Sequence, residues 1–393
     1  MPKLSNRTDT FTESMIRKMT RISIDNNAIN LSQGFPDFNP PKPLLDRLAQ
    51  VAYEGPHQYE VTWGSEKIRA GLVKKHKHFT GQDIDPDKNI VVTCGSTEAM
   101  MATMLTVCNP GEKVIVFSPF YENYSADAIL SSAVPIFVPL NPPEFTFDPN
   151  VLEDAFKQGP KAIIVCNPSN PSGRVFTMDE LKIIAELAVK YDTFVITDEV
   201  YEHIVYKPYK HIYFSNLPGM RERTITCNSL SKTYSITGWR LGYVIAEDYI
   251  IDRVKKVHDF LTVGAAAPLQ EAVSTALAFD DSYYDELLGI YTEKKDLFTY
   301  GLKSLGFDFT EPQGAYYVMV NVGKYKVNND IKFCEWMARE VGVGAVPGSS
   351  FFREDITNYV RFHFAKSSDT LEKALDRLSY LDKKAKAANG HFE

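Results

Sequence analysis

The sequence is 393 residues long, with 43 basic and 50 acidic side chains and a formal net charge of −7. This length is too great for one small core and fits either one large α/β domain or two domains in one chain. Apolar residues make up 44% and charged residues 24%, which is typical of a globular protein and excludes the disordered and fibrous classes. The mild acidic excess argues against a nucleic-acid or membrane-surface partner, because both need concentrated positive charge.

Apolar runs, cysteines and histidines bear on the compartment and on metal binding. No apolar run approaches the ~18 residues that span a bilayer, and the polar amino terminus lacks the apolar core of a signal peptide. The five cysteines are odd in number, far apart and form no CxxC pair, and the histidines are scattered. We therefore expect a cytoplasmic protein with neither a disulfide framework nor a metal site.

Short β-rich runs alternate with helix-like segments between residues 89 and 246. Several runs are almost entirely apolar, which is typical of strands covered on both faces. The helix-like segments include 97–107 and 177–190, and the latter opens with Thr177 and Glu180 at capping-box spacing. This alternation predicts a wound, mostly parallel sheet. The expected strands are 89–93, 113–117, 134–139, 162–166, 193–197, 224–228 and 241–246.

The pattern changes after residue 250. Long helical segments at 283–305 and 331–340 surround two strand-like runs, 316–321 and 359–364, which predicts a second, α+β unit. The first ~45 residues are punctuated by Pro and Asn and are expected to form an arm that joins this smaller unit. The only basic cluster, Lys74–His78, is interpreted as a solvated helix face.

Three polar segments follow strand candidates of the predicted sheet. They are Asn167–Gly173 after AIIVC, Asp198–Tyr201 after TFVIT, and Ser229–Tyr234 after TITCN, with Gly238–Arg240 shortly beyond. Each alone is ordinary, since NPxNP is commonly a turn. Their order and their shared place at one edge of the sheet indicate a ligand site, because such sheets bind ligands at the carboxyl ends of their strands.

These segments resemble the class I/II aminotransferases, the fold-type-I enzymes that use pyridoxal 5′-phosphate. The resemblance runs from Leu31–Phe38 to Tyr359–Phe364, and QGFPDF, DEVYEH and SKTYSITGWRLGY are most similar to kynurenine/glutamine and methionine aminotransferases. It implies an α/β large domain with a mostly parallel seven-stranded sheet and a smaller α+β domain. The implied division is an arm at 1–45, a cofactor-binding domain at 46–284 and a small domain at 285–393.

The resemblance assigns the catalytic groups. Lys232 matches the lysine that forms a Schiff base with the cofactor and then moves the α-proton as general acid and base. Asp198 matches the carboxylate that keeps the ring nitrogen protonated, so that the ring can accept electrons. Tyr201 and Asn170 match the pair that hydrogen-bonds the ring 3′-oxygen, and Tyr121 matches the aromatic residue that stacks on the ring.

The cofactor phosphate needs hydrogen-bond donors and positive charge. Ser96 and Thr97 follow a strand and begin a helix, so their amides should point at an anion. By the resemblance, Ser229 and Arg240 complete this cup. Tyr59 matches a phosphate-contacting tyrosine that comes from the neighbouring subunit, which implies a homodimer, with residues 262–265 at the same interface.

The resemblance also places the substrate carboxylate. Arg361, in NYVRFHF, matches the arginine that forks onto it, and the backbone of Gly34 is expected to approach the same group. We expect a large neutral amino donor (glutamine, methionine, phenylalanine, tyrosine or kynurenine), because no second arginine is obviously aimed at a distal carboxylate.

Three alternatives remain at this point. A pyridoxal-phosphate C–S β-lyase acting on cysteine conjugates would use the same lysine and ring, and so would an aspartate-type aminotransferase. A regulatory protein that keeps the fold as an effector sensor would carry an additional DNA-binding domain, for which this acidic chain has no spare length.

Overall fold

The seven strands predicted between residues 89 and 246 form one sheet in the computed structural model, which describes residues 2–6, 9 and 13–388. The strand order is β2-β8-β7-β6-β5-β3-β4, and β8 alone runs antiparallel to its neighbours. The expected α/β class with a mostly parallel seven-stranded sheet is confirmed. The strands are β2 (Ile90–Thr93), β3 (Lys113–Ser118), β4 (Val134–Pro139), β5 (Ala162–Cys166), β6 (Phe194–Asp198), β7 (Thr224–Ser229) and β8 (Gly242–Ile245).

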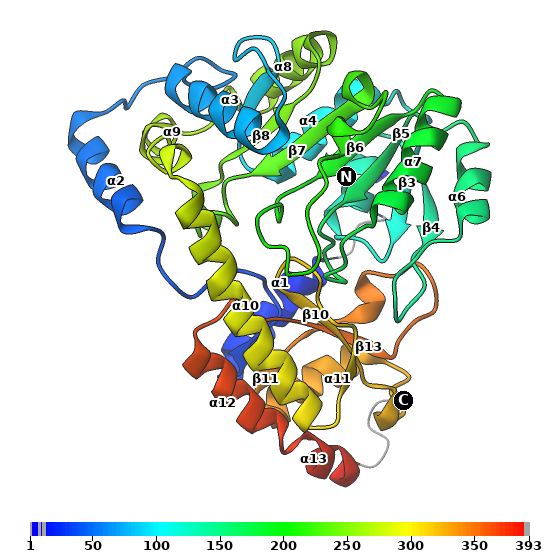
Figure 1. The fold of residues 1–393 in the computed structure, drawn as a ribbon. Coiled ribbons are helices and arrows are strands. Elements are labelled where there is room, and N and C mark those ends of the chain that lie inside the picture. Colours follow the sequence, from blue (N-terminus) through cyan, green and yellow to red (C-terminus); the bar gives the residue numbers. More distant parts are fainter. Residues whose placement is uncertain (1, 7–8, 10–12, 389–393) are drawn as a thin grey trace.

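Helices cover both faces of this sheet, which explains the nearly continuous apolar strands (Figure 1). Along β3, Val114 and Val116 pack into the core beside α4 and α8, whereas Ile115 packs with α6 and α7 on the opposite face. Thr177 and Glu180 form the predicted capping box at the start of α7. The helices of this part are α2 (Lys42–Glu54), α3 (Glu66–Thr80), α4 (Ser96–Val107), α5 (Asn123–Leu130), α6 (Pro149–Phe156), α7 (Met178–Lys190), α8 (Asp248–Thr262) and α9 (Ala267–Val273).

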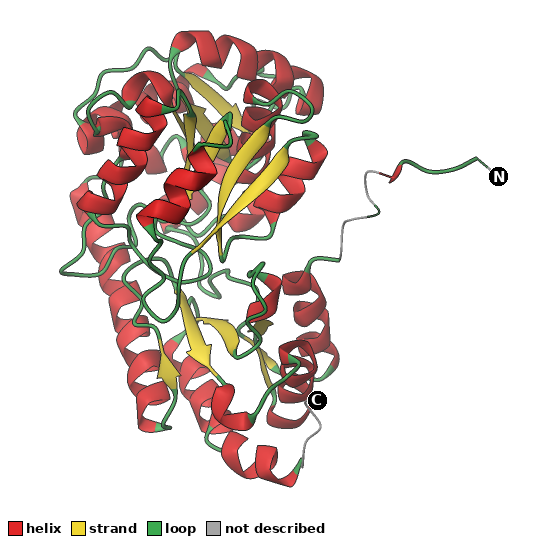
Figure 2. Cartoon of the chain, turned by 90° about the vertical axis from the view of Figure 1, so that its right-hand side faces the viewer, coloured by secondary structure: helices red, strands yellow, loops and turns green. Residues whose placement is uncertain are grey.

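A second body holds a four-stranded sheet of order β12-β13-β10-β9, in which neighbouring strands are antiparallel. The long helix α10 (Asp281–Ser304) runs from the first body along the second (Figures 1 and 2). The strands are β9 (Asp308–Phe309), β10 (Tyr317–Asn321), β12 (Val346–Pro347) and β13 (Tyr359–His363). The helices are α11 (Asp330–Trp336), α12 (Ser368–Leu378) and α13 (Leu381–Ala387).

The amino-terminal segment joins this second body. Helix α1 (Met15–Asp25) packs there, and β1 (Ile29–Asn30) pairs in parallel with β11 (Val343–Gly344). The Leu31 carbonyl also accepts a hydrogen bond from the His363 amide. The division of the chain at residues 45 and 284 stays a prediction, and part of the expected arm lies outside the described residues.

One predicted helix differs from the structure. The segment 331–340 is α-helical only as far as Trp336 and continues as a π-helical turn over Met337–Val341, which ends at Gly342 in the left-handed conformation (φ 78°). A wider turn of this kind does not change which residues are apolar, so the sequence pattern cannot reveal it. Over the described residues, no helix is long and apolar enough to cross a membrane.

Candidate active site

The carboxyl ends of three adjacent strands bring the polar segments together. Cys166 of β5 is in register with Asp198 of β6, and Asp198 is in register with Cys227 of β7. The segments carrying Asn170, Asp198 and Lys232 therefore leave the sheet at one edge, as the sequence predicted. The second body lies over this edge and contributes Arg361 from β13.

The Lys232 amine lies in an enclosed, aromatic setting. Its Nζ donates to the Gly34 carbonyl over 3.3 Å and lies 5.9 Å and 5.7 Å from the ring centres of Tyr201 and Tyr316. Burial, and then the positive charges of Arg240 and Arg361, lower the pKa of Lys232 to about 8, against the opposing charge of Asp198. A substantial share of this amine is therefore neutral near physiological pH, as a nucleophile or general base must be.

The Asp198 carboxylate is buried and held in place. Its Oδ2 accepts a 2.6 Å hydrogen bond from the Tyr124 hydroxyl, and its Oδ1 accepts from the Val200 amide at 3.4 Å. Burial raises the pKa of Asp198, whereas these two donors and the charge of Lys232 oppose the rise. A cationic group bound next to Asp198 would interact strongly with this carboxylate, because the carboxylate is fixed and lies in a low-dielectric environment.

Arg361 is fully buried and has a fixed orientation. Its Nη1 donates to Asn170 Oδ1 over 2.6 Å and its Nη2 donates to the Ser32 carbonyl over 2.7 Å. The guanidinium lies 4.3 Å from the ring centre of Tyr317 and 4.7 Å from that of Phe351. Its Nε has no hydrogen-bond partner among the described residues, and no carboxylate is paired with it there. A buried cation with a spare donor fits an incoming carboxylate.

An anion cup adjoins these groups. Helix α4 begins at Ser96 after Gly95 (φ 82°), and within the described chain no side chain caps its first turn, so the amides of Ser96 and Thr97 are available to an anion. Arg240, in the left-handed conformation, lies so close to Gly95 that a side chain at residue 95 would collide with its guanidinium. Ser229 is buried beside this turn and donates to the Leu241 carbonyl over 3.1 Å.

The structure places the remaining predicted residues as follows. Tyr201 is buried and its hydroxyl lies 2.9 Å from that of Tyr317, while the Tyr121 ring packs edge-on against Tyr124. A side chain on Gly34 would overlap the Tyr317 hydroxyl, which accounts for glycine there. Tyr59 is not brought into the site of its own chain, because it is 90% exposed.

Sequence reasoning missed Tyr124, Tyr316 and Tyr317. Tyr124 contacts Asp198 across 74 residues, and Tyr317 contacts Tyr201 across 116 residues. The Tyr316 hydroxyl donates to Gly34 O over 2.9 Å, beside Lys232. Two signals in the sequence could have found them. Tyr124 follows Tyr121 by three positions, a spacing that places two side chains on the same side of a helical turn, and Tyr316 and Tyr317 begin the predicted strand 316–321.

Comparison with known proteins identifies the family. The model for "Aminotransferase class I and II" matches residues 26–378, and the chain belongs to this family, whose members depend on pyridoxal phosphate. The chain is 33% identical to a probable N-succinyldiaminopimelate aminotransferase of Mycobacterium tuberculosis over 94% of this chain and 96% of the relative. The solved structure of that enzyme from M. tuberculosis aligns with a TM-score of 0.93 at 33% identity, covering 97% of this chain and 100% of the other.

Two other relatives are of similar closeness. A methionine aminotransferase of Escherichia coli is 32% identical, with 94% of this chain and 96% of the relative covered. Human kynurenine–oxoglutarate transaminase 3 is 33% identical, with 91% and 86% covered. The prediction of a fold-type-I aminotransferase is confirmed.

The residues present fit pyridoxal phosphate. The cofactor needs an amine of lowered pKa, a carboxylate for its ring nitrogen and donors for its phosphate. Lys232 and Asp198 supply the first two, and the amides at the start of α4, which no described side chain caps, supply the third beside Arg240. The free Nε of Arg361 is left for the substrate.

Proposed function

We propose that this aminotransferase transfers the amino group of a large neutral amino acid to a 2-oxo acid, using Lys232 as its catalytic amine. The observation that carries this proposal is the setting of Lys232, whose amine has a pKa lowered to about 8 and is acted on by the charges of the buried Asp198 carboxylate and the buried Arg361 guanidinium. Bound pyridoxal phosphate would supply the conjugated ring that accepts the electron pair left when the substrate α-proton departs.

The residues of this chain hold the reactants and move the proton. Lys232 Nζ would accept the α-proton and return it at the neighbouring carbon of the cofactor. Asp198 would hold the proton of the ring nitrogen, and the Tyr124 hydroxyl donates to Asp198 and fixes it. Tyr201 and Asn170 would donate to the ring 3′-oxygen, and Tyr121 would cover one ring face. The amides of Ser96 and Thr97, with Ser229 and Arg240, would hold the phosphate.

The site supports a neutral donor. Arg361 would bind the α-carboxylate beside the Gly34 backbone. The acidic side chain of Glu122 is near enough to act on the charge of Arg361 and would repel a second carboxylate. Two of the relatives described above are named for methionine and kynurenine, whose side chains are uncharged at neutral pH.

We further propose a homodimer in which Tyr59 reaches the phosphate of the partner. Segments 59–63 and 260–264 lie side by side next to the anion cup, since His258 contacts the Thr62 carbonyl at 2.8 Å and the Cys94 thiol contacts the Gly264 carbonyl at 3.8 Å. On these segments Tyr59 and Phe260 are 90% and 91% exposed, which is unusual for large aromatic residues unless a partner covers them.

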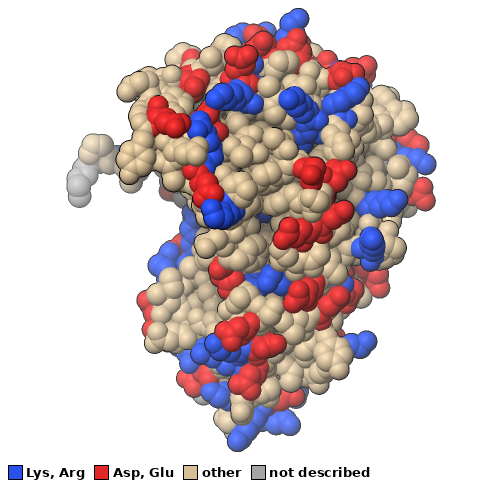
Figure 3. Space-filling model, turned by 60° about the vertical axis from the view of Figure 1, so that its left-hand side comes forward, with Lys and Arg blue, Asp and Glu red and all other residues tan. Residues whose placement is uncertain are grey.

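The surface charge and the cysteines bear on the expected partners and on the expected cytoplasmic location. Acidic and basic side chains are interspersed over the face shown in Figure 3, which does not suit a polyanionic partner. All five cysteines are free, which is consistent with the reducing conditions of the cytoplasm.

Substitution of Lys232 by alanine tests the catalytic assignment. The variant should retain some cofactor through the phosphate cup and Asp198, but it should lose the covalent adduct that borohydride traps. Transamination should fall by at least roughly 10²–10⁴-fold, the typical contribution of a positioned acid–base group. The exposed Lys210→Ala serves as control and should keep both. A borohydride-labelled peptide that contains any other lysine would overturn the assignment.

A screen of all twenty amino acids and kynurenine against the cofactor-loaded enzyme tests the substrate class. Glutamine, methionine or an aromatic donor should change the cofactor absorbance fastest. A much faster reaction with aspartate would show that the proposed class is wrong. Consumption of one 2-oxo acid per product distinguishes transamination from C–S bond cleavage.

A further inference from the structure

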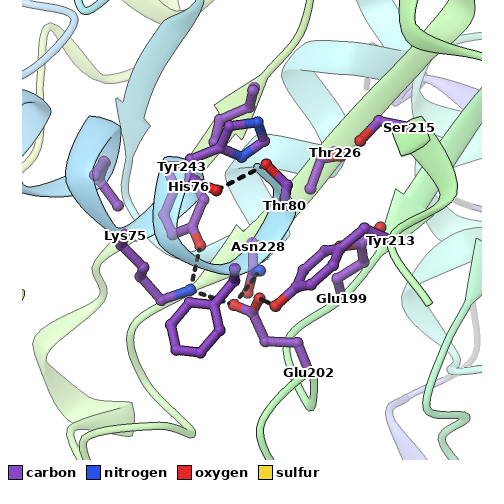
Figure 4. Close-up of a pocket in the computed structure, with 13 residues that line it drawn as sticks. Lys75, His76, Thr80, Glu199, Glu202, Tyr213, Ser215, Thr226, Asn228 and Tyr243 are labelled. Carbon is purple, nitrogen blue, oxygen red and sulfur yellow. Dashed lines mark hydrogen bonds and ion pairs between the residues drawn. The ribbon is translucent and has the colours of Figure 1, made fainter. Parts of the chain in front are cut away.

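Two residues of the basic cluster Lys74–His78, Lys75 and His76, are not on a solvated helix face, which corrects the interpretation of that cluster as solvated throughout. Lys75 is only 7% exposed, whereas Lys74 and Lys77 are exposed. Lys75 lies three residues after the buried Leu72 on α3 and so shares the face of the helix that packs inward. Its amine enters a buried polar cluster behind the active-site turns (Figure 4).

The centre of this cluster is Glu202, the residue after Tyr201. Its Oε1 accepts from Lys75 Nζ over 2.6 Å and from Asn228 Nδ2 over 2.8 Å, and its Oε2 accepts from the Tyr213 hydroxyl over 2.8 Å (Figure 4). The side chains of Lys75 and Glu202 are 6% and 4% exposed. The carboxylate therefore connects α3, β7 and the segment before residue 214 to the turn that carries Tyr201.

Two groups of this cluster, Glu202 and His203, have strongly shifted pKa values. Burial alone would raise the pKa of Glu202, but the charge and the hydrogen bond of Lys75, together with the other groups around the carboxylate, outweigh burial and hold the pKa well below its usual range. Burial lowers the pKa of the neighbouring His203 to about 3, so this histidine is neutral at physiological pH. Lys75 and Glu202 thus form an ion pair in the interior. Buried ion pairs contribute little to stability because desolvation offsets their attraction. The Lys75–Glu202 pair is therefore better explained by the side chains that it holds in place.

The Asn228 side chain links Glu202 to the turn that carries Ser229, a residue of the anion cup. Its Nδ2 is fixed by Glu202, and its Oδ1 accepts the Ser229 amide over 2.7 Å. The Ser229 hydroxyl in turn accepts from the Ser231 amide over 2.9 Å. Rotation of the Asn228 side chain would leave the buried Ser229 amide without its acceptor, so the conformation of this turn depends on the rotamer that Glu202 selects.

We infer that Glu202 and Asn228 are positioning residues that couple the turn bearing Tyr201 to the turn bearing Ser229, and thereby set the affinity for the cofactor. This inference rests on the proposed function, because it takes Tyr201 and Ser229 as cofactor contacts. Neither Glu202 nor Asn228 is among the residues proposed to contact the cofactor. Their effect is on how accurately the ring-oxygen donor and the phosphate donor are placed relative to each other.

The test compares two buried asparagines. Asn228→Ala removes the link between Glu202 and Ser229 and leaves the Lys75–Glu202 pair intact. Asn89→Ala is the matched control: Asn89 is 8% exposed and makes two hydrogen bonds to backbone, at 2.9 Å each, at the opposite end of the sheet from the site. The dissociation constant for pyridoxal phosphate is measured by titrating each apoenzyme, and the thermal unfolding midpoint of each apoenzyme is recorded.

Both substitutions should lower the unfolding midpoint, but only Asn228→Ala should weaken cofactor binding, by roughly tenfold, the equivalent of about one hydrogen bond. Equal dissociation constants for both variants and the wild type would overturn the inference. If Asn228→Ala does not fold, Glu202→Met combined with Lys75→Met removes the acceptor of Asn228 and both charges together, and should weaken binding in the same sense. A wild-type chain that binds no pyridoxal phosphate would instead overturn the proposed function.

Discussion

Arg361 donates to the side-chain oxygen of Asn170 across 2.6 Å, although the two residues lie 191 positions apart in the chain. One belongs to β13 of the second body and the other follows β5 of the large sheet. The contact holds the proposed carboxylate-binding group against the proposed cofactor-binding edge. The site is therefore complete only where the two bodies meet, because each contributes one of these side chains.

Arg361→Lys should raise the KM for the amino donor by roughly 10–100-fold and lower kcat less. Lysine keeps the charge but loses the planar fork and the hydrogen bond to Asn170. Steady-state kinetics with the best donor measures both constants. Arg223→Lys, on the far side of the large body, is the control and should leave them unchanged. An unaltered KM in Arg361→Lys would show that the carboxylate binds elsewhere.

Tyr124→Phe should reduce kcat by roughly 10–100-fold and weaken cofactor binding. It removes the 2.6 Å donor to Asp198, and a hydrogen bond to a charged group contributes about 1.5–3 kcal/mol. Tyr191→Phe, which removes a 3.2 Å hydrogen bond to Glu153 outside the site, is the comparison. Single-turnover rates of the two variants should differ, and equal rates would contradict a role for Tyr124.

Asp127 should make the apoenzyme less stable as the pH rises. It is 3% exposed, its Oδ2 has no hydrogen-bond partner among the described residues, and burial, with the charge of Asp198, raises its pKa from 3.8 to about 8. Between these values the unfolded chain binds fewer protons than the folded chain, so this group lowers stability progressively from pH 3.8 to about 8 and no further above that.

Asp127→Asn should therefore stabilise the apoenzyme at pH 8 by roughly 1–3 kcal/mol, because an amide cannot ionise and so avoids the cost of a buried charge, and by little at pH 4, where Asp127 is already protonated in the folded chain. Urea unfolding at both pH values measures the difference. The exposed Asp285→Asn should show no such dependence on pH. A gain that is equal at pH 4 and pH 8 would contradict the titration of Asp127.

Mixed dimers test the place of Tyr59. Chains with Lys232→Ala and chains with a disruptive Tyr59→Ala substitution should each be poorly active as homodimers at low cofactor concentration. A mixed dimer should recover one complete site, because the Tyr59→Ala chain keeps its Lys232 and receives an intact Tyr59 from its partner. Activity after mixing should approach half that of the wild type per mixed dimer. A fully active monomer in sedimentation would refute the shared site.

The sequence by itself determined the large sheet and the edge at which the site lies. Strands buried on both faces are marked by local apolar runs, and the segments that carry Asn170, Asp198 and Lys232 follow those runs directly. These properties are local, so periodicity and spacing are sufficient to predict them. The resemblance of the motifs to a family added the roles of the residues and the cofactor.

Only the tertiary structure decided which distant groups meet. Tyr124 reaches Asp198 across 74 residues, and Lys75 reaches Glu202 across 127 residues. Neither spacing carries a signal, because contacts between separate helices and strands depend on how those elements pack rather than on the local period. Lys75 shows this most clearly: a lysine in a basic cluster is usually solvated, and the packing of α3 on the sheet is what buries its amine beside a carboxylate.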